Sequence, residues 1–495
     1  MLALPPLATK RGVFLLSKIR VRLQSQHQSV IGPRRFSVAS SRRYASLRIP
    51  DEQIDSLRVD GRRLVGDIHA TAAWGTGERW GDDPTQTGLS RPALSPPTAP
   101  PAPGSSTPRA PSAAPSASTP WATSSRCGRG GGPAPPPSWG RISTRSPRAG
   151  GTMACWGGGG GEMLRVLVEG GVETEFAVGV VDWTNEEGAR FPMSMVASGV
   201  WAGEIPIEKA HALKEVGAGG RTMREELESI GYLGEMEASY KAMPIAAHFE
   251  LHIEQGPLLE SNKQRIGIVH GVQAYRWHTL TVHGRDAHTG TTDFAHRADA
   301  LLTTAKLLLH SHRLATAASA LASTGILSLS PGSTNTVPGR VRFSLDIRAR
   351  EDETLEALEA GLRRDFERIA GGRMSAGWGG GTRGRPCGVR WGLDFRSRAV
   401  GFHADCIQCV EESARGVVRR EEVRREMVSG AGHDSVFTSK RCPTSMIFVP
   451  CRDGVSHHPA EYCSPEDCAT GAQVLLGAVL RYDRLRAERA ERAGI

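Results

Sequence analysis

Long apolar runs are missing from this chain of 495 residues, and a membrane-spanning helix needs about 18 consecutive apolar residues. Acidic residues are missing from residues 1–50, which hold ten of the 61 basic residues. Without those ten, 51 basic residues face 52 acidic ones, so the net charge of +9 is a property of the leader. We therefore expect neither a membrane nor a nucleic acid as a partner.

A regular cysteine pattern is also missing, because the nine cysteines stand at irregular spacing and predict no disulfide framework. Cys406 and Cys409 have the spacing of a redox or zinc-ribbon pair, but no second pair accompanies them. They lie in a helical pattern over residues 405–417, which favours buried structural cysteines.

The leader, residues 1–50, is rich in Arg and Ser and carries a short apolar run at 13–16 between cations. This composition is typical of a mitochondrial transit peptide. A disordered basic tail and a mispredicted start are the alternatives. The location that follows is mitochondrial or cytoplasmic.

Histidine, aspartate and glutamate are all missing from residues 90–160. Pro, Ala, Ser, Gly and Arg dominate from residue 96 to 161, and such a segment cannot bury enough apolar surface to fold. Globular patterning resumes at residues 163–168.

Around this segment the patterning predicts an α/β protein. Residues 53–272 form a first α/β part, residues 273–390 a separate α+β domain, and residues 391–495 a second α/β part. The α+β domain is predicted from strands at 277–283, 324–330 and 341–347 and helices at 296–309 and 353–369. The second α/β part is predicted from helices at 405–417 and 465–492 and a buried strand at 445–449.

The stretch 176–190 carries the most chemistry, because an apolar strand pattern delivers Glu186 and Glu187 into a turn closed by Gly188. His252 and His457 stand in short polar motifs downstream. Imidazole and carboxylate ligands with one spare glutamate are the residues of a zinc hydrolase. Taken singly, a Glu-Glu pair is most often a solvated face and a lone histidine is most often structural.

Six ordered motifs together resemble one family, the N-carbamoyl-L-amino-acid hydrolase, β-ureidopropionase and allantoate amidohydrolase branch of the M20 metallopeptidase-like family. The motifs are Thr-Asn-Glu-Glu-Gly at 184–188, Glu-Leu-His-Ile-Glu-Gln-Gly-Pro at 250–257, Ala-His-Thr-Gly-Thr-Thr at 287–292, Ser-Thr-Asn-Thr-Val-Pro-Gly at 333–339, Ser-Gly-Ala-Gly-His-Asp at 429–434 and Ser-His-His-Pro at 456–459. The resemblance covers roughly residues 162–480, with a weaker match at 60–95.

The resemblance implies a dinuclear-metal, exopeptidase-like catalytic domain with an inserted α+β lid that forms a homodimer. It implies two divalent metals, zinc or manganese, with Glu186 as general base and Glu187, His252 and His457 as ligands. The positions that would contact the substrate are Gln255, His288, Asn335, Arg348, Gly432 and His433. The residues alone leave alternatives open: Asn335 can simply make a turn, Arg348 can pair with a strand neighbour, and residues 430–433 can be a flexible turn.

The chain departs from the family where a Gly-Ser-His-x-Asp-Thr-Gln motif and a later Asp-Gly should precede Glu186. A shifted reading frame joins the third base of each codon to the first two bases of the next codon. Across residues 139–157 this frame permits the sequence Gly-Ser-His-Leu-Asp-Thr-Gln-Pro-Thr-Gly-Gly-Arg-Tyr-Asp-Gly-Val-Leu-Gly. At four codon junctions the shifted frame permits one residue only, and each of these residues agrees with that sequence. The junctions are Trp139/Gly140, Met153/Ala154, Cys155/Trp156 and Trp156/Gly157. We infer that residues 96–157 are translated out of frame; a genuine Pro/Ala/Ser linker is the alternative.

The hypothesis is a metal-dependent amidohydrolase that cleaves the ureido C–N bond of a small N-carbamoyl amino acid. Because the lost segment would carry a histidine and an aspartate, we expect this chain to bind fewer than two metals and to be inactive. An M20-type aminoacylase or peptidase is a second hypothesis, and a catalytically dead homodimer is a third.

Overall fold

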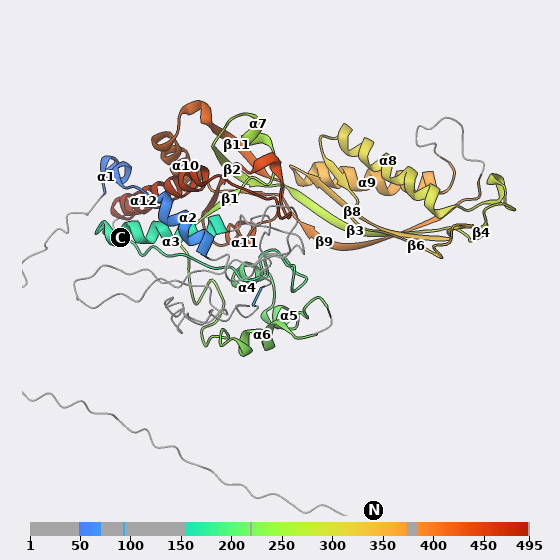
Figure 1. The fold of residues 1–495 in the computed structure, drawn as a ribbon, viewed down its shortest axis with the longest axis horizontal. Helices are drawn as coiled ribbons and strands as arrows, with labels where there is room; N and C mark the ends of the chain where they lie inside the picture. The colour runs from blue at the N-terminus through green and yellow to red at the C-terminus, as the bar shows by residue number, and fades with distance from the viewer. Residues whose placement is uncertain (1–48, 71–92, 95–153, 218–219, 374–383, 494–495) are drawn as a thin grey trace, which may run out of the picture. The chain divides into compact units, whose positions relative to one another are not determined.

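The computed structural model describes residues 49–70, 93–94, 154–217, 220–373 and 384–493 (Figure 1). The leader and nearly all of the segment inferred to be out of frame lie outside these ranges, so a mitochondrial transit peptide stays a prediction. In the described ranges, no helix is long and apolar enough to cross a membrane.

The first sheet has five strands. Its strands are β1 (His248–Ile253), β2 (Ile266–Val272), β10 (Val400–Gly401), β11 (Val423–Ser429) and β12 (Thr444–Val449). β1 runs parallel to β12, β12 runs antiparallel to β2, and β2 also pairs with β10 and β11. All of β12 and most of β1 are buried, as expected for strands covered on both faces.

Alternation along the strands separates two cores. Leu251 of β1 and Ile447 of β12 point to one face, where they pack against helices α3 (Ala154–Glu169), α10 (Ala404–Val417) and α12 (Pro465–Ala493). Phe448 points to the opposite face with a smaller apolar cluster. Side chains alternate across a strand, so Glu250 and His252 also lie on that second face, away from the helices.

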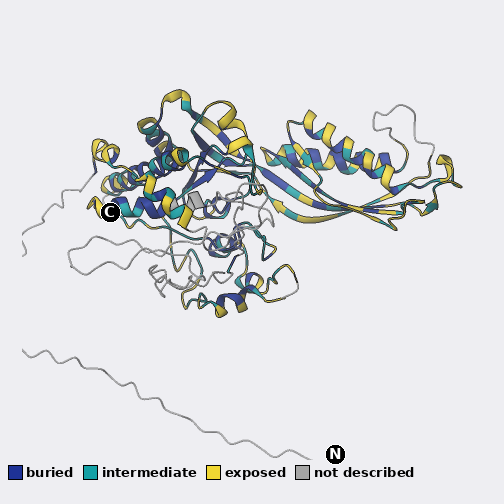
Figure 2. Ribbon diagram, in the orientation of Figure 1, coloured by how far each residue is buried: buried dark blue, intermediate teal, exposed yellow. Residues whose placement is uncertain are grey.

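The second sheet lies between β2 and β10 in the sequence, so its domain is inserted into the first. β3 (Ala274–His283) pairs along its whole length with β8 (Arg340–Ala349) on one side and β9 (Gly388–Ser397) on the other. β5 (Leu321–Ser323) and β6 (Leu327–Ser330) extend the sheet beyond β8. Helices α8 (Ala300–Ala317) and α9 (Asp352–Ala370) cover one face, with their buried sides toward the strands (Figures 1 and 2).

Short elements complete the described chain. They are α1 (Asp51–Ser56), α2 (Gly61–Ala70), α4 (Val196–Trp201), α5 (Ile207–His211), α6 (Met223–Ser229), α7 (Leu258–Ser261), β4 (Ala287–His288), β7 (Thr336–Val337) and α11 (Ser435–Thr438), with single 3₁₀ turns at Phe294–His296, Arg420–Glu422 and Arg452–Gly454.

Most predicted elements are confirmed, including the α/β class with an inserted α+β domain. Cys406 and Cys409 are buried on α10, and burial raises the thiol pKa of Cys409 to about 12, so neither behaves as a reactive cysteine. The inserted domain extends past its expected boundary at residue 390, because β9 belongs to its sheet. Helix α8 begins at Ala300 and not at residue 296, because the Asp299 side chain caps it by accepting from the Leu302 amide at 2.8 Å.

The strand predicted to begin at Phe176 is wrong in this structure. Residues 176–183 carry no strand, apart from a one-residue bridge at Val180. A β-strand exists only through hydrogen bonds to a neighbour, and no strand of the described ranges runs beside this stretch.

Candidate metal centre

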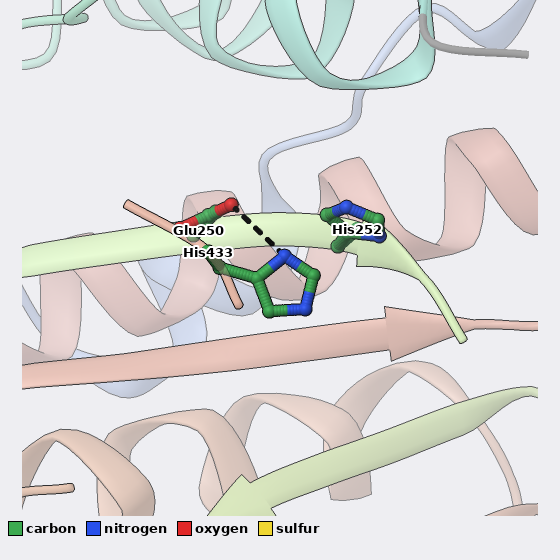
Figure 3. A group of neighbouring side chains, drawn as sticks. All are labelled: Glu250, His252 and His433. Carbon is green, nitrogen blue, oxygen red and sulfur yellow. Dashed lines mark ion pairs between the residues drawn. The ribbon is translucent and has the colours of Figure 1, made fainter. Parts of the chain in front are cut away.

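Three side chains from two elements form the centre of the site. Glu250 and His252 stand two residues apart on β1 and therefore share a face of the sheet. His433 reaches them from the loop between β11 and α11, and its ring centroid lies 4.3 Å from that of His252 (Figure 3). Each residue offers one donor atom, and these atoms lie within 4.8 Å of one another. Two imidazole nitrogens and one carboxylate oxygen are a donor set that suits zinc.

A second pair of donors comes from the two expected ligands Glu187 and His457. The Nε2 atom of His457 lies 3.3 Å from a carboxylate oxygen of Glu187. His457 has a left-handed backbone, with φ of 57°, and its amide donates to Glu461 at 3.0 Å. The buried Glu461 carboxylate therefore holds the loop in the shape that presents the His457 ring.

The turn that carries Glu186 and Glu187 is held by its own side chains. Asn185 has a φ of 60°, and its amide nitrogen donates to the carbonyl oxygens of Phe191 and Met193 at 3.0 and 3.1 Å. Gly188 has a φ of 69°, and a Cβ there would lie 2.6 Å from the Ser194 amide nitrogen. A glycine is required at this position for both reasons. The turn buries Glu186 and leaves the Glu187 side chain 14% exposed.

The site gathers three buried acids whose pKa values are raised. Burial raises the pKa of Glu186 well above its usual range, and nearby carboxylates raise it further. Burial likewise raises the pKa of Glu250 to about 7 and that of Asp434 well above its usual value. In the described chain, no Lys or Arg forms an ion pair with these three acids. Burial lowers the pKa of His433 to about 3 and that of His252 well below 6.5, which keeps both imidazoles neutral.

This combination fits a divalent cation. Neutral imidazoles are the form that binds metals, and clustered carboxylates without a basic partner need a positive charge. Glu250, His252 and His433 supply three donors, and Glu187 and His457 supply two more. The expected ligand set is thus regrouped: His252 lies with Glu250 and His433, while Glu187 lies with His457.

Three expected substrate contacts lie at this site: His433, which joins the candidate metal donors instead, and Gln255 and Gly432. The Gln255 side chain donates to the Ser456 hydroxyl at 2.9 Å and lies 3.4 Å from the Nε2 atom of His457. Gly432 packs so closely that a Cβ there would lie 2.7 Å from the Tyr275 hydroxyl. The close approach of the loop to Tyr275 therefore depends on a glycine at position 432.

Arg348 has partners already. Its guanidinium donates to both carboxylate oxygens of Asp346, at 3.0 and 2.6 Å, and to the carbonyl oxygen of Gly430 at 2.5 Å. The first contact is the pairing with a strand neighbour that the sequence left open. The second ties Arg348 to the loop that carries His433.

His288 and Asn335 do not join this group. The Nδ1 atom of His288 accepts from the amides of Gly290 and Thr291, and the carbonyl oxygen of Asn335 accepts from the Thr289 amide at 3.0 Å. Both belong to the β4–β7 end of the inserted domain, where Asn335 makes a turn. Within the described chain, none of their hydrogen bonds reaches Glu186 or the histidines.

Three residues of the site were not predicted. Glu250 had a signal in the sequence, since it precedes His252 by two positions in a strand. Asp434 had a weaker one, because it follows His433 directly; its carboxylate accepts from the Ser198 hydroxyl. His248 is buried between the Trp183 indole, which donates to it at 3.3 Å, and the Ser435 and Thr438 hydroxyls, and nothing in the sequence indicated that packing.

Comparisons with known proteins identify the family of the chain. Residues 151–481 match the model of peptidase family M20/M25/M40. An N-carbamoyl-L-amino-acid amidohydrolase of Rhizobium meliloti is 36% identical over 325 residues, which are 64% of this chain and 73% of that protein. Allantoate amidohydrolase of Bacillus subtilis is 30% identical over 303 residues, covering 60% of this chain and 68% of that protein.

The fold has close counterparts among solved structures. An amidase of the hydantoinase/carbamoylase family from Burkholderia multivorans is 33% identical with a TM-score of 0.65, and the match covers 86% of this chain and 98% of that one. A second such amidase, from Burkholderia ambifaria, is 30% identical with a TM-score of 0.66 over 86% and 98% of the two chains. The chain belongs to peptidase family M20/M25/M40, in the branch that contains the N-carbamoyl-L-amino-acid and allantoate amidohydrolases.

Proposed function

We propose that the gene of this chain encodes a metal-dependent amidohydrolase that cleaves the ureido C–N bond of N-carbamoyl amino acids. The observation that carries the proposal is the cluster of neutral histidines and buried acids around Glu250, His252 and His433, where no Lys or Arg of the described residues forms an ion pair with the acids. The names of the Rhizobium meliloti and Bacillus subtilis relatives support the ureido substrate class. The reaction consumes one water and yields an amino acid, ammonia and carbon dioxide.

The site residues have different proposed roles, which follow from their chemistry. Divalent metals held by Glu250, His252 and His433 and by Glu187 and His457 would supply Lewis-acid polarisation of the ureido carbonyl. Glu186 is buried and has a raised pKa, so it can take a proton from the attacking water and return it to the leaving amine.

Substrate contacts follow from the groups beside the cluster. Gln255 offers an amide next to His457, where it can bind a substrate oxygen or nitrogen. Arg348 can reach a substrate carboxylate only by exchanging a present partner, so we assign it first to holding the loop at Gly430. His288 and Asn335 act on substrate only if the inserted domain, or that of a second subunit in a homodimer, brings them to the cluster.

We also propose that this translation is inactive and binds less metal than the gene product should. The family match begins at residue 151, close to where the shifted frame would end, and supports the displaced frame. About a quarter of the Rhizobium meliloti relative is left without a counterpart, since 73% of it is matched. A shifted frame would restore a histidine and an aspartate to a site that now has five donors in two groups.

The test compares this chain with a chain translated in the restored frame across residues 96–157. Both are loaded with zinc or manganese, dialysed, and assayed for bound metal and for ammonia release from N-carbamoyl amino acids, with N-acetyl amino acids and dipeptides as competing substrates. We expect about two metals and turnover of the ureido substrates from the restored chain only, and loss of turnover by at least about 100-fold in its Glu186→Gln variant. The exposed Glu426→Gln variant is the matched control.

Any of the following outcomes would refute one part of the proposal. Preference of the restored chain for N-acetyl amino acids or dipeptides would make it an aminoacylase or peptidase. A restored chain that binds no metal and turns over nothing would leave a catalytically dead dimer. Full metal content and ureido turnover in the chain as it stands would refute its predicted inactivity.

A further inference from the structure

The two carboxylate oxygens of Glu250 have different partners. Oε2 accepts two hydrogen bonds from Ser435, one from the hydroxyl at 2.7 Å and one from the backbone amide at 3.1 Å. Oε1 faces the candidate metal centre and lies 3.9 Å from the Nδ1 atom of His433 (Figure 3). That distance is too long for a hydrogen bond, and within the described ranges this Nδ1 atom has no hydrogen-bond partner. Ser435 therefore fixes one oxygen of the carboxylate and directs the other to the metal centre.

A second buried polar residue, His248, lies behind Ser435 and precedes Glu250 by two positions on β1. Its Nε2 atom lies 3.3 Å from the Nε1 atom of the Trp183 indole. An indole N–H can only donate, so the His248 Nε2 atom accepts and carries no proton. Burial lowers the pKa of His248 to about 4, so the ring is neutral near pH 7 and its single proton is on Nδ1.

This tautomer determines where the hydroxyl proton of Ser435 goes. The His248 Nδ1 atom lies 3.4 Å from the Ser435 hydroxyl oxygen and 3.3 Å from that of Thr438. Because Nδ1 carries a proton, it donates to these oxygens and cannot accept from Ser435. The Thr438 hydroxyl lies 3.3 Å from the Thr444 hydroxyl and can donate to it. The Ser435 hydroxyl therefore donates to its nearer acceptor, Glu250.

Trp183, His248 and Ser435 are all buried. Burying polar groups costs free energy unless they find hydrogen-bond partners, and the donors of this chain of hydrogen bonds lead toward Glu250. We propose that the three residues form a relay that positions Glu250 to bind a metal through Oε1. They act through Glu250 and are therefore positioning residues. The inference rests on the metal centre of the proposed function, but not on the ureido substrate.

A purely structural role of the same three residues predicts a different result. Hydrogen bonds that only stabilise the core would change the free energy of unfolding, but not the affinity of the folded chain for zinc. Partners that orient a metal ligand usually change the metal affinity by about 10- to 100-fold when they are removed. The zinc affinity and the position of the ring proton of His248 therefore distinguish the two roles.

The first measurement uses the metal-free full chain, isotope-labelled at its histidine nitrogens for NMR. We expect His248 to show an unprotonated Nε2 atom and a protonated Nδ1 atom, with the resonances assigned by a His248→Gln variant. Trp183→Phe keeps an aromatic ring but has no N–H, so the proton should move to Nε2 in part of the molecules. A protonated Nε2 atom in the parent would overturn the relay.

The second measurement is the dissociation constant for zinc, obtained by competition with a chelating indicator. Ser435→Ala removes the hydroxyl donor and should weaken zinc binding by about tenfold or more, and Trp183→Phe should weaken it by a smaller factor. Ser439→Ala is the matched control, because the Ser439 hydroxyl follows the same short helix but donates to the Val436 carbonyl oxygen at 3.0 Å. If Ser435→Ala does not fold, Trp183→Phe still tests the relay.

The outcomes separate this inference from the proposed function. Equal zinc affinity in the parent, the two relay variants and the control would overturn the relay and leave the proposed function standing. Weaker zinc binding in the relay variants, together with a restored chain that hydrolyses no ureido substrate, would support the relay and refute the proposed function. A parent that binds no zinc would overturn the relay, because Glu250 would then be no metal ligand in this chain.

Discussion

Glu250→Gln should stabilise the metal-free protein, although it removes a buried side chain of the proposed metal centre. Burial raises the pKa of Glu250 from 4.5 to about 7 while Ser435 donates to it through its amide and hydroxyl at 3.1 and 2.7 Å. Because the folded-state pKa is raised, the stability contributed by this carboxyl is fully present below pH 4.5 and is lost as the pH rises through 7. At about 1.4 kcal/mol per pKa unit, ionised Glu250 costs the folded state about 3 kcal/mol at pH 8.

The glutamine cannot ionise and keeps an oxygen for Ser435, so the variant escapes that cost. In EDTA, its free energy of unfolding should exceed that of the parent by about 2 to 3 kcal/mol at pH 8 and by less than about 1 kcal/mol at pH 5. Urea unfolding followed by tryptophan fluorescence at both pH values measures the difference, with the exposed Glu426→Gln as control. Zinc should reverse the order, since only the parent keeps the Glu250 ligand. A variant that is no more stable than the parent at pH 8 in EDTA would refute the reasoning.

Three further variants test separate parts of the structure. Gly432→Ala brings a methyl group within 2.7 Å of the Tyr275 hydroxyl and should lower the free energy of unfolding, measured by thermal melts, by about 1 to 3 kcal/mol. Gly430→Ala is the control, because a methyl group there would lie 3.5 Å from its nearest neighbour and should change the free energy of unfolding little. Phe366→Ala empties a fully buried site in the inserted domain and should cost about 3 to 5 kcal/mol, seen as an earlier unfolding step by calorimetry. The Arg190 side chain lowers the pKa of Glu215 by donating a hydrogen bond to its carboxylate, so the stability contributed by this pair is present above pH 4.5 and is lost as the pH falls. Between about pH 5 and 3, the urea midpoint of the Glu215→Gln variant should therefore fall less than that of the parent.

The elements that could be predicted from the sequence are those whose signals are local. The alternation over residues 277–283 and 341–347 predicted β3 and β8, and the helical patterns at 405–417 and 465–492 predicted α10 and α12 nearly to the residue. Residues 176–183 also have an apolar strand pattern, but they form no strand apart from the one-residue bridge at Val180. Its pattern describes the side chains, whereas the strand needs a neighbour that this chain does not supply in the described ranges.

Only some residues of the candidate site could be predicted from the sequence, and their grouping could not. Motif order gave Glu187, His252 and His457 together, and only the fold shows that His252 lies with Glu250 and His433. The proximity of Glu250 and His252 could have been predicted from their i, i+2 spacing, because a strand places residues at this spacing on one face. The approach of His433 depends on the path of β11 across the sheet, which no local pattern contains.

The structure also bears on whether residues 96–157 are a genuine linker or a displaced frame. An inserted linker adds residues to a domain and leaves its sheet complete, so the strand beside the insertion should still have its neighbour. β1 instead has a buried edge that faces a cavity, beside an apolar stretch that forms no strand. The acids at the edge of the same cavity have raised pKa values and no basic partner in the described ranges. Within the described ranges, a strand edge without a neighbouring strand and buried acids without a basic partner at one place are what removal of a strand would produce, and an added linker accounts for neither.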